Sequence, residues 1–269
     1  YCLIFGKGGF PVMGIAGAAI ASSVSEAVSL LFFIIYTGTT ADKRKYGFRR
    51  AFTFRPHLLK GMLSISGWTM VQSFISVSIW FIFFLAIEHL GERPLAVTNI
   101  VRNISALLIM VISAFATTAG ALISNQIGAG EQRYLFRTCG MTLNLTYAIL
   151  VPLLVILCLF PEPVLRVFTD NPSLIAASIN SVYVMSTSTL IMAPAFILFN
   201  AVSGTGNTKA GFIMEMISLT VYTAAVYYIV IRLKPDVALC WFSEHVYGIA
   251  LIALAWWYLK SGKWRGKKV

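Results

Sequence analysis

Polar side chains recur at helical spacing inside three stretches of the sequence that are otherwise apolar. Residues three, four, seven or eleven positions apart lie on one face of an α-helix, so each stretch is expected to carry a polar face. Polar groups are costly in lipid, and such a face favours a hydrated cavity in which hydrogen bonds hold a solute or an ion. The residues expected to line this cavity are Gln72, Ser73, Ser76, Trp80, Asn99, Arg102, Asn103, Asn180 and Tyr183.

Two interpretations of this polar set are open. Serine and threonine also let helices pack closely and hydrogen-bond to each other, which would make the polar face an interface between helices. Gln72, Asn99 and Asn103 are larger and favour the cavity. Arg102 lies roughly 10 Å along its helix, where its side chain either reaches the outer membrane surface or faces internal water. The ring of Trp80 would offer an aromatic face to a cationic solute.

Four acidic residues fall in or beside the apolar stretches, and ionisable groups at membrane depth usually serve transport. Glu88 and Glu244 lie near the ends predicted to face outward, where water solvates them. Glu26 and Glu215 lie deeper, and either could carry a proton. A second interpretation of Glu215 pairs it with a basic cytoplasmic group such as Lys209.

The sequence contains no motif typical of zinc binding, phosphate binding or catalysis. The four cysteines and three histidines are scattered, without the paired spacing of a zinc site. Two glycine-rich turns, Gly128–Glu131 and Gly204–Asn207, lack the ending of a phosphate-binding loop and are typical of helix ends. A membrane-embedded enzyme would need a cluster of reactive groups at membrane depth, and no histidine falls deep in an apolar stretch. We therefore expect no catalytic residue, no metal and no organic cofactor.

The composition of the sequence predicts which secondary-structure elements hold these polar residues. The 269 residues are 58% hydrophobic and 12% charged, whereas soluble domains are about 45–50% apolar and about 25% charged. Stretches of about 20 apolar residues are long enough to cross a bilayer as helices. The sequence therefore predicts an all-α integral membrane protein with about seven transmembrane helices. The predicted spans are 11–37, 62–87, 95–127, 139–160, 174–203, 210–231 and 238–259.

The formal net charge of +11 is explained by topology rather than by nucleic-acid binding. If the first span ends in the cytoplasm, most of the 21 Lys and Arg residues fall in cytoplasmic loops and in the C-terminal tail, as the positive-inside rule requires. An odd number of spans then places Tyr1 outside and Val269 inside. We expect a multi-pass protein of the cell (inner) membrane, with a cytoplasmic C-terminus and the lipid bilayer as its partner.

A long basic connection divides the spans into two groups. We expect residues 1–37 to end one bundle of helices, residues 38–60 to form a cytoplasmic loop, and residues 61–269 to form a second bundle with a basic tail. The chain begins with Tyr1, and no charged leader precedes its first apolar span. It is therefore expected to be the later portion of a longer product.

Four segments together resemble a known family. They are Gly8–Ser22 (GGFPVMGIAGAAIAS), Leu90–Leu107 (LGERPLAVTNIVRNISAL), Ile123–Glu131 (ISNQIGAGE) and Asn200–Gly211 (NAVSGTGNTKAG). The first resembles the entry to the sixth helix of the multidrug and toxic-compound extrusion (MATE) family, and the second resembles its junction of helices seven and eight. The last two resemble its cytoplasmic turns after helices eight and ten. Their order and spacing match over essentially the whole chain.

The resemblance implies twelve helices in two six-helix lobes that face a central cavity. This chain would supply the end of helix five, helix six, the connection between lobes and the whole second lobe, and its partner would be the missing first lobe of the same protein. The family works by alternating access. The implied function is that of a secondary active antiporter that exports organic cations or other amphipathic small molecules in exchange for H⁺ or Na⁺, with the coupling ion in place of a cofactor.

The resemblance also has a departure that bears on coupling. The sodium-coupled branch of the family has acids in helices seven and ten, and in this sequence Ser76 falls at the first of these positions and Pro194 falls near the second. Because neither side chain is ionisable, we expect the coupling acid in the missing lobe. The alternative function is that of a flippase for a lipid-linked saccharide or another lipid-like substrate, which a more strongly basic cavity would favour.

Overall fold

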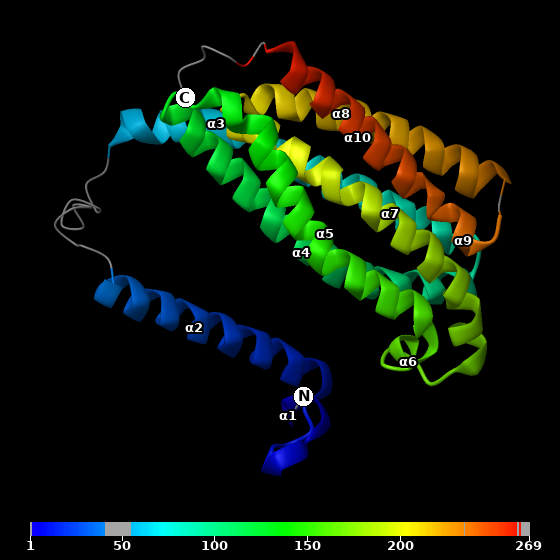
Figure 1. The fold of residues 1–269 in the computed structure, drawn as a ribbon. Coiled ribbons are helices and arrows are strands. Elements are labelled where there is room, and N and C mark those ends of the chain that lie inside the picture. Colours follow the sequence, from blue (N-terminus) through cyan, green and yellow to red (C-terminus); the bar gives the residue numbers. More distant parts are fainter. Residues whose placement is uncertain (1, 41–54, 234, 263, 265–269) are drawn as a thin grey trace. The chain divides into compact units, whose positions relative to one another are not determined.

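The computed structural model describes residues 2–40, 55–233, 235–262 and 264 of the chain (Figure 1). All regular structure in these residues is helical, and the chain divides into two compact units, residues 1–59 and 60–269. Within the described ranges, seven helices are long and apolar enough to cross a membrane. The predicted fold class, an all-α chain with seven membrane-spanning helices, is confirmed.

The first unit consists of one long helix and a short hairpin that precedes it. Its elements are α1 (Cys2–Phe5), η1 (Lys7–Gly9) and α2 (Gly14–Thr40). The hairpin folds back because the Met13 N–H donates to the carbonyl oxygen of Leu3 at 3.0 Å. Gly17 makes this return tight, since a Cβ there would collide with the same carbonyl group. Within its unit α2 exposes apolar side chains along its length, as a helix surrounded by lipid does.

The predicted basic connection, residues 38–60, lies partly outside the described residues. α2 continues through residues 38–40, and α3 (Pro56–Glu88) begins before residue 60 and continues into the second unit. Proline suits the first turn of a helix, where its missing N–H has no helical partner. Residues 41–54 are not described, so the connection stays a prediction.

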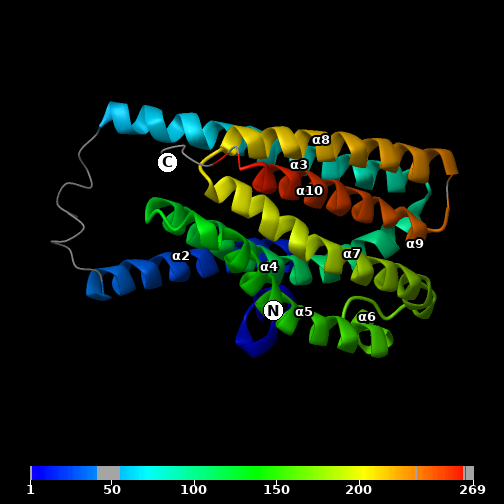
Figure 2. The ribbon, with the colours of Figure 1, turned by 45° about the horizontal axis from the view of Figure 1, so that its top comes forward.

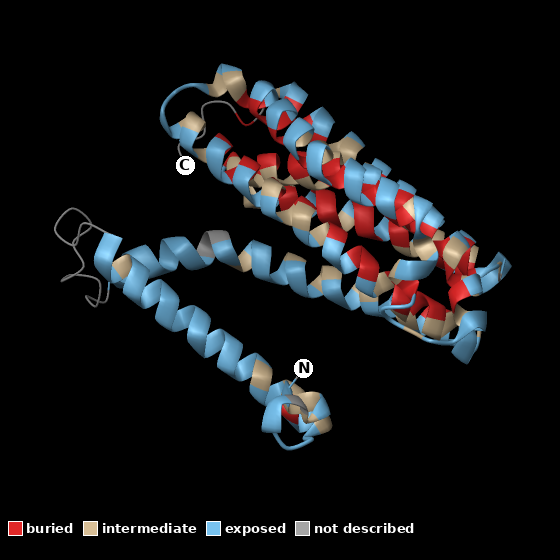
Figure 3. Ribbon diagram, turned by 60° about the horizontal axis from the view of Figure 1, so that its bottom comes forward, coloured by how far each residue is buried: buried red, intermediate tan, exposed pale blue. Residues whose placement is uncertain are grey.

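The second unit is a bundle in which α7 is the central helix. Its elements after α3 are α4 (Glu92–Gly128), η3 (Gln132–Tyr134), α5 (Leu135–Leu159), α6 (Pro161–Leu165), α7 (Pro172–Gly204), α8 (Thr208–Val226), η4 (Tyr227–Leu233), α9 (Val237–Cys240) and α10 (Phe242–Ser261). α7 packs against α4, α5, α8 and α10 (Figure 2). More than half of the most apolar part of α7 is buried, and the buried residues of the unit lie on the inside of the bundle (Figure 3).

A pair of glycines brings α4 and α7 into close contact. A Cβ added to Gly204 would lie 2.5 Å from the carbonyl oxygen of Gly120, and one added to Gly120 would lie 2.9 Å from that of Asn200. Real Cβ atoms do not approach a carbonyl oxygen so closely, so only glycine allows this backbone separation. Small residues at a crossing of membrane helices provide such contacts.

α7 remains helical through Pro194, which cannot donate a backbone hydrogen bond. The carbonyl oxygen of Leu190, four residues earlier, would otherwise accept that bond. Instead it accepts one from the hydroxyl of Tyr147 in α5, at 2.8 Å. A side chain of a neighbouring helix therefore replaces the backbone bond that proline removes.

Asn207 begins α8 and also ties it to α10. Its side-chain oxygen accepts the N–H of Ala210 at 3.3 Å, and its amide nitrogen donates to the hydroxyl of Tyr258 at 2.6 Å. We expect Asn207→Ala to lower the free energy of unfolding by about 1 kcal/mol, the usual effect of losing a helix N-cap. Thermal unfolding of the purified protein measures this. Asn207→Asp keeps the cap and should lose less stability, and equal losses for the two variants would contradict the capping role.

Candidate functional site

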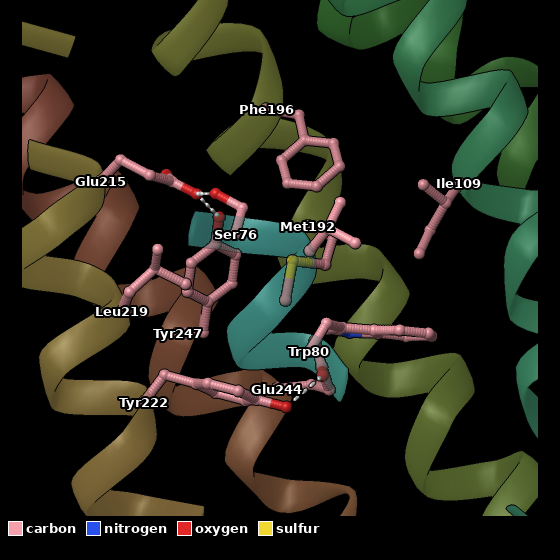
Figure 4. Close-up of a pocket in the computed structure, with 11 residues that line it drawn as sticks. Ser76, Trp80, Ile109, Met192, Phe196, Glu215, Leu219, Tyr222, Glu244 and Tyr247 are labelled. Atoms are coloured by element: carbon pink, nitrogen blue, oxygen red, sulfur yellow. Dashed lines mark hydrogen bonds between the residues drawn. The ribbon is translucent and has the colours of Figure 1, made fainter. Parts of the chain in front are cut away.

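A cavity of about 270 Å³ lies within the second unit, between α3, α4, α7, α8 and α10 (Figure 4). Most of its lining is aliphatic or aromatic, which is typical of a site for a small organic molecule. Its polar and polar-aromatic lining residues come from three helices. They are Ser76 and Trp80 on α3, Glu215 and Tyr222 on α8, and Glu244 and Tyr247 on α10.

The periodicity of each helix explains why these residues face one cavity. Residues three, four or seven positions apart share a helix face. Ser76 and Trp80 are four apart, and Glu244 and Tyr247 are three apart. On α8, Tyr222 follows Glu215 by seven residues. Each helix therefore presents two polar side chains, one turn or two turns apart, to the same space.

Glu215 is the most deeply buried acid of the cavity, with 4% of its surface exposed. Its Oε1 atom accepts a hydrogen bond from the Ser76 hydroxyl and another from the Tyr247 hydroxyl, both at 2.9 Å (Figure 4). Its Oε2 atom is buried and has no hydrogen-bond partner among the described residues. One oxygen of this buried carboxyl therefore has hydrogen-bonding capacity that the described residues do not use.

Glu244 is the second acid of the cavity. The Tyr222 hydroxyl donates to its Oε1 atom at 3.1 Å, and the Trp80 side chain is a further polar neighbour of the carboxyl. The rings of Tyr222 and Tyr247 meet edge to face, with centroids 5.8 Å apart. The two carboxyls are thus each hydrogen-bonded to one tyrosine of a pair whose rings are in contact.

The structure brings three of the predicted cavity-lining or proton-carrying residues to this cavity, namely Ser76, Trp80 and Glu215. Glu215 bonds to Ser76 and Tyr247, whereas Lys209 lies over the ring of Trp68 with its Nζ atom 5.9 Å from the centroid. Among the described residues, Glu215 and Lys209 therefore do not form the pair that was the alternative interpretation of Glu215.

Two further residues on α3 lie close to the cavity without lining it. The main-chain oxygen of Gln72 lies 3.0 Å from the Ser76 hydroxyl oxygen, so it shares the one hydroxyl hydrogen with the Glu215 carboxyl, while the Gln72 side chain is half-buried. Ser73 is exposed. Only part of the predicted polar face of this helix therefore lines the cavity, because its residues cover a wider part of the helix surface than the cavity does.

The other predicted cavity residues lie elsewhere in the second unit. The guanidinium of Arg102 lies over the ring of Phe84, 5.0 Å from its centroid, and its Nε atom is buried without a partner in the described part of the chain. Asn99 is half-buried, whereas Asn103 and Tyr183 are exposed. Asn180 lines a separate pocket of about 320 Å³ near the ends of α4, α7 and α9.

Glu26, the other acid expected to carry a proton, lies exposed on α2 in the first unit. Glu244 is predicted to lie near the membrane surface, whereas the structure places its carboxyl in the cavity against Tyr222. Tyr222 and Tyr247 are not among the predicted cavity residues. Their spacing in the sequence could have indicated both tyrosines, because Tyr222 shares a helix face with Glu215 and Tyr247 shares one with Glu244.

The family model described as MatE matches residues 69–229, which include α4, α5 and α7 in full. The chain is 26% identical over its whole length to the probable multidrug resistance protein NorM of Thermotoga maritima, and it covers 58% of that protein. It is 25% identical to the uncharacterized transporter YisQ of Bacillus subtilis, with 81% of this chain and 48% of that protein aligned.

Solved structures agree on the fold. The MATE transporter VcmN of Vibrio cholerae in its bent form matches with a TM-score of 0.70 at 16% identity, over 78% of this chain and 48% of that one. A MOP superfamily transporter from Pyrococcus furiosus matches with a TM-score of 0.66 at 12% identity, over 74% and 44%. The chain spans about half the length of the curated relatives it matches.

Proposed function

Because the chain belongs to the MatE family, the multidrug and toxic-compound extrusion family that its sequence resembles, we propose that it is part of a secondary active antiporter. The antiporter exports organic cations or other amphipathic compounds in exchange for H⁺ or Na⁺. The observation that carries this proposal is the buried carboxyl of Glu215, which faces a cavity inside a bundle of membrane-length helices. An ionisable group in that setting is costly and is retained for function.

The cavity has the chemistry that a cation carrier needs. A carboxylate attracts a cation strongly in apolar surroundings, and the faces of Trp80 and the two tyrosines add attraction between cation and ring. A coupling ion that neutralises the carboxyl removes this attraction and releases the substrate. Binding of the two ligands is then mutually exclusive, which is the basis of exchange by alternating access.

The lobe arrangement follows from the same family membership. In the proposal, α3, α4, α5, α7, α8 and α10 form the second lobe, α2 ends the first lobe, and the missing part of that lobe is the partner. The protein would lie in the inner membrane with a cytoplasmic C-terminus, consistent with the positions of its basic residues. Rocking of the lobes would give the substrate access to either side of the membrane in turn.

The acid for coupling need not come from the missing lobe. Ser76 holds the position at which the sodium-coupled branch has an acid, and here the Glu215 carboxyl reaches that serine from α8 at 2.9 Å. Glu215 on α8 thus places a carboxyl group beside the position on α3 where Ser76 has none. This supports a coupling role for the present lobe.

The flippase alternative fits the cavity less well. A lipid-linked saccharide carries a negatively charged phosphate group, and a site for it would present Lys or Arg side chains. Among the described residues that line the cavity there are two carboxyls and no basic side chain. A phosphate would therefore be repelled where an organic cation is attracted.

The function is tested by export of a fluorescent organic cation from cells that make the full-length protein. We expect lower steady-state accumulation of the dye than in cells without the protein, and recovery of accumulation when the H⁺ and Na⁺ gradients are both collapsed. Vesicles with an imposed gradient of one ion at a time identify the coupling ion. Equal accumulation with and without the protein, for several dyes and under both gradients, would refute export.

A further inference from the structure

A second pocket lies where α4, α7 and α9 begin, at one end of the second unit. Its volume is about 320 Å³, and it shares no lining residue with the cavity that contains Glu215 and Glu244. We call it the end pocket. Among the described residues, its charged or polar lining residues are Arg93 on α4, Asn180 on α7 and Asp236, which precedes α9. The antiport proposed above uses none of these three side chains.

Arg93 is fixed at the end pocket by the start of the neighbouring helix α7. Its Nη2 atom donates to the hydroxyl of Ser173 at 2.9 Å and lies 3.3 Å from the Ser173 carbonyl oxygen. A guanidinium has five N–H groups in a rigid plane, and these contacts use one of its three nitrogens. The other two nitrogens have no hydrogen-bond partner among the described residues. Their N–H groups are available to an anionic oxygen, and a phosphate fits this planar group well.

Asp236 supplies the opposite charge from another element. Its Oδ1 atom accepts the backbone N–H of Val237 at 2.8 Å and so caps α9. Its Oδ2 atom makes no hydrogen bond with a described residue. Arg93 and Asp236 line the same pocket, and yet they form no ion pair with each other. A positive and a negative group are therefore held at separate positions of the end pocket.

This lining distinguishes between kinds of charged ligand. Arg93 would attract a simple anion that Asp236 repels, and the reverse holds for a simple cation. A zwitterion satisfies both side chains, and the Asn180 amide can donate to its anionic end or accept from its cationic end. Among the described lining residues none is aromatic, so a quaternary ammonium group would find no ring face. A primary ammonium group, in contrast, can donate hydrogen bonds to the carboxylate.

We propose that the end pocket binds a phosphoethanolamine group, with the phosphate at Arg93 and the primary ammonium at Asp236. This site is independent of which solute the cavity exports. In the orientation that the basic residues favour, α4 and α7 begin at the outer face of the membrane, so the end pocket lies near the level of the lipid headgroups. The group has two sources, the headgroup of phosphatidylethanolamine and free phosphoethanolamine.

Native mass spectrometry of the full-length protein, in detergent micelles with one added phospholipid, tests the proposal. The lipids are phosphatidylethanolamine, phosphatidylcholine and phosphatidylglycerol with identical oleoyl chains, so that only the headgroup differs. We expect the Kd of the first bound lipid to be at least about tenfold lower for phosphatidylethanolamine than for the other two, because only its headgroup offers both a phosphate and a hydrogen-bonding ammonium. Equal Kd values for the three lipids, together with no preference for free phosphoethanolamine, would overturn the proposal.

Two variants separate the roles of the two charges. Asp236→Asn keeps a side chain that can cap α9 and removes the carboxylate. It should weaken binding of phosphatidylethanolamine at least about tenfold and strengthen binding of the anionic phosphatidylglycerol. Arg93→Gln should weaken binding of phosphatidylethanolamine without strengthening that of phosphatidylglycerol. Gel filtration verifies that each variant is folded.

Matched controls remove exposed charges outside the end pocket. Arg232→Gln and Asp170→Asn change side chains that do not line it, and both should leave the three affinities unchanged. If Asp236→Asn and Arg93→Gln behave like these controls, the two charges do not form the site and the proposal is wrong.

Free phosphoethanolamine distinguishes the two sources of the group. If it displaces the lipid and stabilises the delipidated protein against heat, whereas phosphocholine does neither, the site binds a soluble zwitterion. If the lipid is retained in its presence, the site binds a membrane lipid. If phosphoethanolamine and its lipid bind no better than phosphocholine and its lipid, the proposal fails. Export of organic cations by the wild-type protein would still support the antiport in that case.

Discussion

Replacing both cavity acids with glutamine, in the double variant Glu215→Gln/Glu244→Gln, should abolish binding and export of organic cations. The two carboxyls are the negatively charged groups among the described residues that line the cavity. Loss of a buried charge partner costs about 2–4 kcal/mol of binding free energy, or about 30- to 1000-fold in Kd. Glutamine is close in size to glutamate and still accepts hydrogen bonds, so the helices should stay in place. Equilibrium binding and export from proteoliposomes measure the effect.

A matched double variant provides the control for the loss of two charges. Glu88→Gln/Glu92→Gln removes two exposed acids at the ends of α3 and α4, outside the cavity, and should bind cations like the wild-type protein. If the double variant of the cavity acids binds a monovalent cation within about threefold of wild type, the carboxyls are not the cation site. The aromatic rings alone would then account for binding.

Gly204→Ala should destabilise the folded protein more than the same substitution at Gly120 or Gly248, the other two tightly packed glycines of the second unit. The new Cβ would lie 2.5 Å from the carbonyl oxygen of Gly120. The atom in its way belongs to the backbone of α4 and cannot rotate aside as a side chain would. α4 and α7 must move apart along a contact that runs through the core, and such overpacking costs about 1–3 kcal/mol. A lower unfolding temperature and a lower yield of monodisperse protein are the expected results.

Gly140→Ala is the matched control for this substitution. Gly140 lies inside α5, and a Cβ added there meets no atom within 4 Å. Alanine favours a helix over glycine by about 0.5–1 kcal/mol, so Gly140→Ala should leave stability unchanged or raise it. Equal behaviour of the two variants would contradict the close approach of α4 and α7.

The helices could be predicted from the sequence because one long apolar run is enough to define each of them. Their ends were predicted less well, and the reason is physical. α3 begins at Pro56, several residues before its apolar run, because proline is well accommodated in the first turn of a helix. The packing of α4 on α7 through Gly120 and Gly204 was not predictable, since it depends on which helices meet.

The cavity was predicted in part, for a similar reason. Helical periodicity relates residues of one helix, and it correctly set Ser76 and Trp80 on a common face. It gives no information about partners on another helix. Glu244 was expected at the membrane surface because it lies near a helix end, and nothing local to it reveals that a tyrosine of α8 reaches its carboxyl. The hydrogen bonds of Tyr222 to Glu244 and of Tyr247 to Glu215 join two different helices. The periodicity of a single sequence does not predict contacts of this kind.

The proline in α7 makes that helix a natural place for motion. Met192 and Phe196, two walls of the cavity, lie on either side of Pro194. At that point the helix lacks one backbone bond, and the phenol of Tyr147 occupies the free carbonyl group of Leu190. Bending α7 there would require release of a single side-chain contact, whereas bending elsewhere would break the helical ladder. A bend of α7 at Pro194 would therefore move two lining residues of the cavity, and the hydrogen bond from Tyr147 would resist that bend.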